Sequence, residues 1–144
     1  MRGSFWSPFS TGSLGLVLLL GCSDPLKPED VVGVYQATEF TILLNGAGTN
    51  LLASGASVTL ELKSDGSTGG HFVLPLIPGV TIVAVDDDLT GSFILRNDVV
   101  RLEQAADTYI KDFFFVAADN QLRASQVIND GNKTGNLRLV LTRQ

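Results

Sequence analysis

Residues 57–63, Ser-Val-Thr-Leu-Glu-Leu-Lys, decide the fold class because polar and apolar side chains alternate at every step. A period of two is typical of a β-strand with one buried face. The Asp-Gly pair at 65–66 is typical of a tight hairpin turn. Residues 71–74, His-Phe-Val-Leu, are the expected partner strand, which stops at Pro75 because proline cannot donate to a sheet. The sequence therefore predicts an antiparallel β-hairpin in this region.

Strand patterns continue on both sides of this hairpin. Upstream, residues 33–44 are rich in Val, Ile, Thr, Tyr and Phe, which favour strands. Downstream, residues 136–143 alternate most cleanly, with three leucines on one face. Asn-Asp at 97–98 and Asp-Asn at 119–120 are typical of hairpin turns. Further strands are expected at residues 80–85, 89–96, 99–104, 108–117 and 121–128.

About eight strands joined mostly by short turns, with no long helix, predict an all-β domain with antiparallel neighbours. Such an up-and-down meander either closes into a barrel or splits into a β-sandwich, and closure alone removes exposed edges. We expect the barrel; the sandwich is the alternative, favoured by residues 80–85 and 113–116, whose apolar side chains fall on both faces of a strand. Residues 45–50 form a turn by composition, and residues 51–57 fit a half-buried loop or a short helix.

The amino-terminal residues have the features of an export signal. Positive charge at Arg2 precedes a short apolar run, residues 14–20, that is too short to cross a bilayer. The sequence Leu-Leu-Gly-Cys at 19–22 resembles the bacterial lipobox, in which a signal peptidase cuts ahead of the cysteine. The resemblance implies that Cys22, the only cysteine, carries diacylglycerol and a further acyl chain such as palmitate. Several acyl chains make membrane attachment stable.

These features divide the chain into three parts. We expect residues 1–21 to be a lipoprotein signal peptide, residues 22–30 a lipidated tether, and residues 31–144 the barrel domain. Ser23, which is not aspartate, is similar to the pattern that directs enterobacterial lipoproteins to the outer membrane. The expected location is therefore the bacterial cell envelope, with a lipid anchor in the outer membrane.

The mature domain is acidic. Removing the leader takes away Arg2 and leaves nine of the ten basic residues against all fifteen acidic ones, a net charge of −6. This balance argues against a nucleic-acid partner, because phosphate binding needs clustered lysine and arginine. It also argues against a polybasic membrane patch, so attachment is expected to come from the lipid.

Residues 29–35, Glu-Asp-Val-Val-Gly-Val-Tyr, resemble the start of lipocalin-like domains, where a helical turn leads into Gly-x-Trp on the first strand. Tyr35 stands here in place of the usual Trp. Residues 91–102, 120–123 and 137–143 resemble the second half of small bacterial lipocalin-like domains. In that family a late basic residue packs over the first-strand aromatic ring at the closed end of the barrel. The resemblance implies that Arg143 or Arg138 meets Tyr35, a cation–π contact worth about 0.5 to 2 kcal/mol.

An eight-stranded barrel either fills its interior with side chains or holds one small ligand. The leading hypothesis is a binding or carrier protein for an apolar or amphipathic molecule, in a cavity lined by Phe72, Leu74, Phe93 and Phe115. The alternative is a filled barrel or sandwich that acts as a protein-interaction or structural module of the envelope. An outward-facing Phe114 would favour that alternative.

No pattern indicates an enzyme, a cofactor or a metal site. His71 is the only histidine, so a His-based triad or metal site would need it, and its position on the strand predicts a surface side chain. Three aspartates at 86–88 could offer oxygen ligands to calcium, but the EF-hand spacing and glycine are missing. We expect these aspartates to form a solvated turn between two strands.

Overall fold

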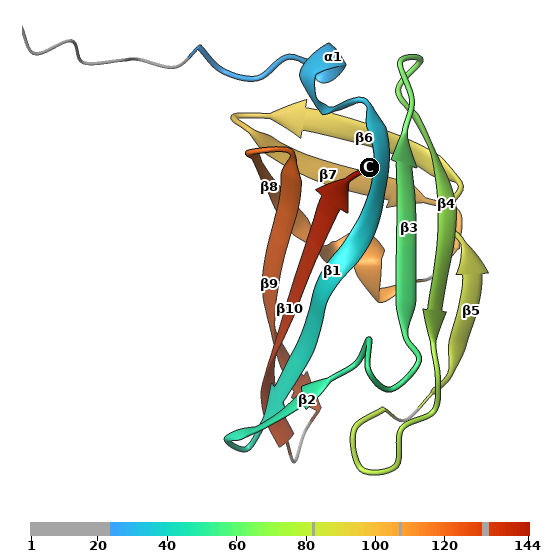
Figure 1. The fold of residues 1–144 in the computed structure, drawn as a ribbon, viewed down its shortest axis with the longest axis vertical. Coiled ribbons are helices and arrows are strands. Elements are labelled where there is room, and N and C mark those ends of the chain that lie inside the picture. The colour runs from blue at the N-terminus through green and yellow to red at the C-terminus, as the bar shows by residue number, and fades with distance from the viewer. Residues whose placement is uncertain (1–23, 82, 107, 131–132) are drawn as a thin grey trace, which may run out of the picture.

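The computed structural model describes residues 24–81, 83–106, 108–130 and 133–144. This part of the chain consists almost entirely of β-strands, with one short helix at each of two connections (Figure 1). In chain order the elements are α1 (Pro28–Val31), β1 (Gly33–Leu44), β2 (Ala47–Asn50), β3 (Ser57–Leu62), β4 (Ser67–Leu74), β5 (Val85–Asp88), β6 (Gly91–Arg96), β7 (Val99–Gln104), the 3-10 helix η1 (Tyr109–Asp112), β8 (Phe114–Ala118), β9 (Gln121–Asp130) and β10 (Lys133–Arg143).

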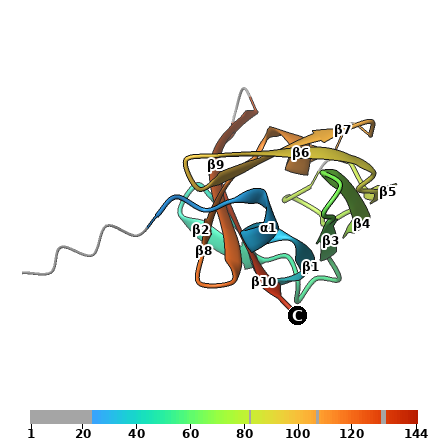
Figure 2. The same cartoon turned by 90° about the horizontal axis from the view of Figure 1, so that it is seen from above.

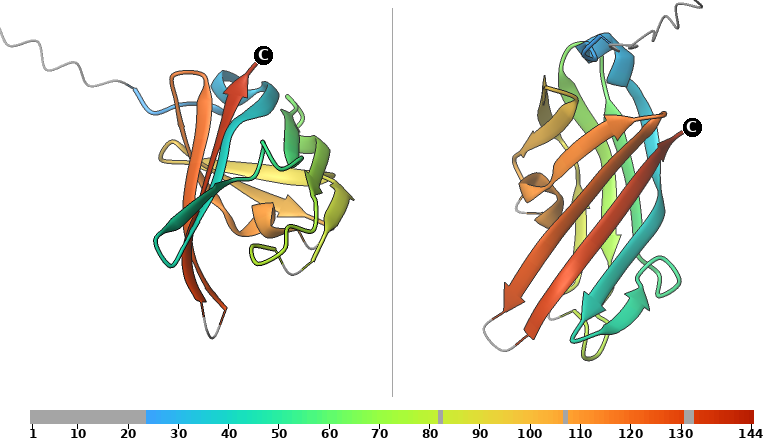
Figure 3. Two further views of the ribbon diagram at one scale, coloured as in Figure 1. Left: turned by 60° about the horizontal axis from the view of Figure 1, so that its bottom comes forward. Right: turned by 90° about the vertical axis from the view of Figure 1, so that its left-hand side faces the viewer.

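Eight strands pair in a closed antiparallel ring, in the order β1, β3, β4, β6, β7, β8, β9 and β10. The ring closes where β10 pairs with β1, from Tyr35 opposite Arg143 to Leu44 opposite Gly135. The other two strands extend the wall, β2 beside β1 and β5 beside β4. Figure 3 shows the strands running obliquely around the barrel. The predicted all-β, up-and-down barrel is confirmed, the sandwich alternative is wrong, and the fold is compatible with a lipocalin-like domain.

Tight turns between sequence neighbours fix the pairing of the strands. Asn97 and Asp98 both have positive φ, at 50° and 62°, and Asp119 and Asn120 do too, at 52° and 60°. Positive φ at both central residues is the geometry of the two-residue hairpin turn whose twist matches that of the flanking strands. The two predicted hairpin turns are therefore confirmed. The turn expected at residues 45–50 is shorter than predicted, because its second half forms β2.

The strand expected at residues 80–85 is wrong. The side-chain hydroxyl of Thr81 accepts a hydrogen bond from the amide of Ile77 (2.6 Å) and donates one to the carbonyl of Pro75 (3.0 Å). These local bonds hold the segment as a turn, and strand pairing starts only at β5. The three aspartates at 86–88, expected to form a turn, are therefore part of a strand that hydrogen-bonds to β4.

The strand expected at residues 108–117 is half correct. Its first part forms the 3-10 helix η1, and only its second part forms β8. Residues three apart in a 3-10 turn lie on the same side, so Ile110 and Phe113 both point into the core and are buried. A continuous strand would have placed these two side chains on opposite faces.

The two ends of the barrel differ. The short helix α1, which matches the predicted helical turn, covers the end where β1 begins and β10 finishes (Figures 1 and 2). Its Val31 side chain is buried, and the amide of Leu26 ahead of it donates to the carboxylate of Asp98 in the β6–β7 turn (2.8 Å). The opposite end is bordered by β2, by the loop of residues 75–84 and by the far ends of β9 and β10 (Figure 1).

Candidate functional site

A cluster around Tyr35 and Arg143 seals the end of the barrel beneath α1. The guanidinium of Arg143 lies over the ring of Tyr35, 5.5 Å from its centroid. Its Nη2 donates to the carbonyls of Asp30 (2.7 Å) and Val32 (2.6 Å), and the Tyr35 hydroxyl donates to the carbonyl of Val31 (2.7 Å). Burial raises the pKa of Tyr35, and the nearby Arg143 charge offsets part of this increase. The cluster therefore ties the first and last strands to the carboxyl-terminal end of the helical turn.

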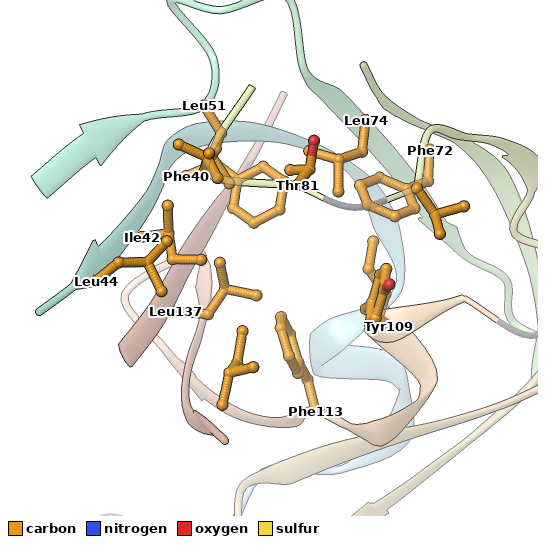
Figure 4. Close-up of a pocket in the computed structure, with 15 residues that line it drawn as sticks. Phe40, Ile42, Leu44, Leu51, Phe72, Leu74, Thr81, Tyr109, Phe113 and Leu137 are labelled. Carbon is orange, nitrogen blue, oxygen red and sulfur yellow. The ribbon is translucent and has the colours of Figure 1, made fainter. Parts of the chain in front are cut away.

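An apolar cavity of about 340 Å³ lies at the opposite end (Figure 4). Its lining residues come from β1, β4, η1, β9 and β10, from Leu51 in the turn after β2, and from the described residues of the 75–84 loop, so segments far apart in the sequence form it. Figure 4 shows aromatic and aliphatic side chains converging on one space. Those that define its walls are Phe40, Ile42, Phe72, Leu74, Phe113 and Leu137.

Among the described residues, the cavity lining has few polar groups and no charged side chain. The hydroxyl of Thr81 is already bonded within its own loop, to the amide of Ile77 and the carbonyl of Pro75. Tyr109 on η1 lines the cavity and is half-exposed, which places its phenol ring at the boundary with solvent. An occupant would therefore gain most from burying apolar surface, with any polar end left near the mouth.

The residues predicted to bind a ligand divide into two pairs. Phe72 and Leu74, on β4, line the cavity. Phe93 on β6 and Phe115 on β8 are buried in the core but lie outside the cavity lining. The lining from η1 was missed because that segment was expected to be a strand. The lining from β1 was missed because no single motif marks it.

A β-bulge in β1 determines which residues of that strand line the cavity. The pairing with β10 shifts between Ala37 and Glu39, at Thr38. Before the bulge the odd-numbered Tyr35 faces inward, whereas after it the even-numbered Phe40 and Ile42 are buried. A bulge adds one residue to one strand and reverses the inside–outside alternation beyond it. The bulge therefore turns the aromatic ring of Phe40 into the cavity and leaves Glu39 facing outward.

His71 lies outside the cavity, on the surface of β4, where it contacts two of the three aspartates. Its Nδ1 lies 2.9 Å from Asp88 and its Nε2 lies 2.7 Å from Asp86, both at carboxylate oxygens. Within the described ranges no group of three or more His, Cys, Asp and Glu side chains is placed to hold a metal ion. The imidazole instead connects β4 to the edge strand β5.

The titration of His71 gives a pH-dependent prediction. Hydrogen bonds with Asp88, and then Asp86, raise the pKa of His71 above its ordinary value of 6.5. Because the folded pKa is raised, the contact stabilises the β4–β5 pairing at low pH and is lost as the pH rises through that pKa. An NMR titration of this single imidazole should show a midpoint above 6.5, moved back toward it most strongly by Asp88→Asn. A midpoint at or below 6.5 in the unmodified protein would contradict the contact.

The predictions for residues 1–23 lie outside the described residues. These are the signal peptide, the cleavage position and lipid attachment at Cys22. The described part of the chain contains no helix with the length and apolar character needed to cross a bilayer.

No protein-family model and no curated protein matches this chain. Fold and geometry alone therefore define the class to which it is assigned. It is a small closed β-barrel, sealed at one end by a helical turn, with an apolar cavity at the other end.

Proposed function

We propose that the barrel binds one small apolar or amphipathic molecule in the cavity at the end opposite α1. The observation that carries this proposal is a space of about 340 Å³ with a mostly apolar lining. Ligand sites in proteins are typically about 300 to 1,000 Å³ and mostly apolar. Since one water occupies about 30 Å³ in the liquid, the space suits roughly ten to twelve non-hydrogen atoms.

The lining also limits the chemistry of the ligand. An ionised group buried among these side chains would lose its hydration without gaining a charged partner, which costs several kcal/mol. A bound molecule therefore has its apolar part inside and any charged or polar group at the mouth, beside Tyr109. A neutral hydrophobic molecule, or the chain of an amphipathic one, fits these conditions.

Two neighbouring residues of β9 provide a matched test of the cavity. Ile128 lines the cavity, whereas the Val127 side chain is 67% exposed. The only tryptophan, Trp6, precedes the described residues, so a domain that begins at residue 24 contains no tryptophan of its own. In a domain of residues 24–144, Ile128→Trp should occupy the cavity and lower the affinity for an apolar fluorescent dye by about ten-fold or more, equivalent to about 1.4 kcal/mol. Val127→Trp should leave the affinity unchanged within about two-fold.

Both variants are titrated with the dye, and circular dichroism shows that each is folded. A loss confined to the Ile128 variant supports binding inside the barrel. Equal affinity in the two folded variants would place the dye elsewhere and contradict the proposal.

We further propose that lipid on Cys22 holds this barrel at the bacterial envelope. The lipobox-like sequence is the support for this anchor. The described chain enters the barrel at the α1 end, with Leu26 bonded to Asp98. The attachment point would therefore lie at the sealed end, and the cavity at the other end would stay accessible to a ligand.

Cys22→Ser tests the anchor in the bacterial host. We expect this variant to keep its leader and to carry no acyl chains, because the serine hydroxyl does not replace the thiol as the acceptor of the lipid. Metabolic labelling with a palmitate analogue should label the original protein and not the variant. Labelling of the Cys22→Ser protein, or normal leader removal in it, would contradict the proposed anchor.

The alternative function is an interaction module, and one observation favours it. The Phe114 side chain on the outside of β8 is 63% exposed, and Val116 beside it is also exposed. Exposed apolar groups that gather on a surface mark contact sites. This function uses the outer wall of the barrel, so it does not require the cavity to be filled by a ligand.

A further inference from the structure

The outer wall formed by β6, β7 and β8, with the start of β9, combines exposed apolar side chains with arginines. The exposed apolar groups come from β6 and β8, and one arginine comes from each of β6, β7 and β9. We call this surface the Arg–Phe face, defined by Ile94, Arg96, Arg101, Phe114, Val116 and Arg123.

Strand pairing brings these residues together from separate parts of the sequence. Ile94 pairs with Arg101, which pairs with Phe114, so three neighbouring strands contribute one row. The guanidinium of Arg101 lies 5.7 Å from the centroid of the Phe114 ring. Because residues two apart in a strand share a face, Arg96 and Val116 belong to the next row.

That second row continues the same mixture of side chains. Arg96 pairs with Val99, Val99 with Val116, and Val116 with Arg123 on β9. Each row therefore combines basic and apolar groups across the outside of the barrel. Strands lie about 4.8 Å apart, so neighbouring groups in a row are close enough to meet one surface together.

The described residues of β6, β7, β8 and the start of β9 include three outward arginines against one exposed acidic residue, Glu103 on β7, so their charge contrasts with that of the acidic chain. Lys63 and Arg138 pair with Glu61 and Glu39 elsewhere on the barrel. The three arginines of the Arg–Phe face have no carboxylate partner among the described residues. Arg123 donates instead to the side-chain amide oxygen of Gln121 (2.6 Å). These arginines therefore remain available to an external anion.

The segment that leads into α1 joins the barrel next to this face. The amide of Leu26 is bonded to Asp98 in the turn that joins β6 to β7, directly after Arg96. Cys22 is four residues before Leu26, a distance of at most about 14 Å along an extended chain. A chain held at a membrane through its amino terminus would therefore have the Arg–Phe face close to that membrane.

We propose that the Arg–Phe face lies against an anionic lipid bilayer. Phe114 and Val116 enter the headgroup region, and Arg96, Arg101 and Arg123 bind lipid phosphates. Dispersed along the sequence, three arginines in an acidic protein do not indicate a membrane patch. The fold gathers them beside exposed apolar groups. Attraction to lipid phosphates and burial of apolar side chains can therefore act together at one surface.

A domain of residues 24–144 tests the proposal without any lipid anchor, because α1 and every strand of the barrel lie within this range. It also contains no tryptophan, so Phe114→Trp introduces a single tryptophan, whose emission can be followed selectively, on the face. Leu76→Trp is the control, an exposed apolar residue in the loop at the other end. With phosphatidylglycerol vesicles we expect a blue shift in emission for Phe114→Trp and none for Leu76→Trp. High salt should reduce the shift, because screening weakens the arginine contacts.

Vesicle sedimentation measures the contribution of the arginines. Arg101→Gln and Arg123→Gln should each lower partitioning onto phosphatidylglycerol vesicles roughly five-fold. Arg138→Gln, on another side of the barrel, should leave it unchanged. Equal binding to phosphatidylcholine vesicles would overturn the proposal. Absence of binding to phosphatidylglycerol vesicles at low salt would also overturn it, and would point to an acidic protein surface as the occupant. Neither result depends on whether the cavity binds a ligand.

Discussion

Arg143→Ala is expected to lower the free energy of unfolding by about 3 kcal/mol. The guanidinium donates to the carbonyls of Asp30 and Val32 and lies over Tyr35, so the substitution removes two charged hydrogen bonds and a cation–π contact. Small domains have total stabilities of about 5 to 15 kcal/mol. Losing these contacts should therefore cause a clear decrease in the urea midpoint, measured by circular dichroism.

Two further variants separate the specific contacts of the Arg143 guanidinium from the general loss of a positive charge. Arg138 lies on the same strand, is largely exposed, and pairs with Glu39 at 3.1 Å. Exposed pairs are worth at most about 1 kcal/mol, so Arg138→Ala should have a small effect. Arg143→Lys should recover only part of the stability, because a single ammonium group cannot reproduce the planar fork of arginine. Equal losses in the two alanine variants would contradict a special role for Arg143.

Phe115→Ala is expected to destabilise the domain by about 3 to 5 kcal/mol. The Phe115 side chain is fully buried, and its ring centroid lies 5.8 Å from that of Phe113 in an edge-to-face arrangement. Removing a buried aromatic ring loses its transfer free energy and leaves a cavity that the packed core fills only partly. The measurement is the free energy of unfolding from urea titration, with the slope compared to detect changes in the unfolded state.

The neighbouring Phe114 provides a matched control with the same chemical change. Its ring points outward, and its one described ring contact is with Arg101. Phe114→Ala should therefore cost less than about 1 kcal/mol. If the alanine variants of Phe114 and Phe115 were equally destabilised, the inside and outside faces of β8 would be assigned incorrectly.

The alternation of polar and apolar residues predicted the antiparallel strands, and the barrel was preferred over the sandwich because closure removes exposed edges. The alternation works well for β3, where Val58, Leu60 and Leu62 are all buried, and for β10, where the three leucines face the core. Paired asparagine and aspartate residues also identified the turns, because they adopt positive φ more readily than most residues. These signals are local, so each can be recognised within a few residues.

The cavity was harder to predict because non-local features decide it. The bulge at Thr38 reverses the inside–outside alternation of side chains in β1. It can be recognised only from the register in which β1 pairs with β10. The 3-10 turn of η1 places Ile110 and Phe113 on one side, which no period-two pattern indicates. Phe93 and Phe115 were expected to line the cavity and are instead packed in the core, because side-chain identity does not show which part of the interior is packed and which is open.

The Arg–Phe face illustrates the same limitation for the surface. Arg96 and Arg123 lie 27 positions apart in the sequence, yet three pairing steps, through Val99 and Val116, connect them. Net charge averages over all such positions and therefore conceals a local basic surface. Only the strand register brings these residues into one row.

Native mass spectrometry of the domain purified from its own host tests the binding of a ligand in the cavity most directly. The account predicts a folded species heavier than the polypeptide by the mass of one small apolar or amphipathic molecule. This additional mass should be absent from Ile128→Trp and retained by Val127→Trp. Detection of the bare polypeptide mass alone, together with no binding of apolar dyes or fatty acids, would contradict it.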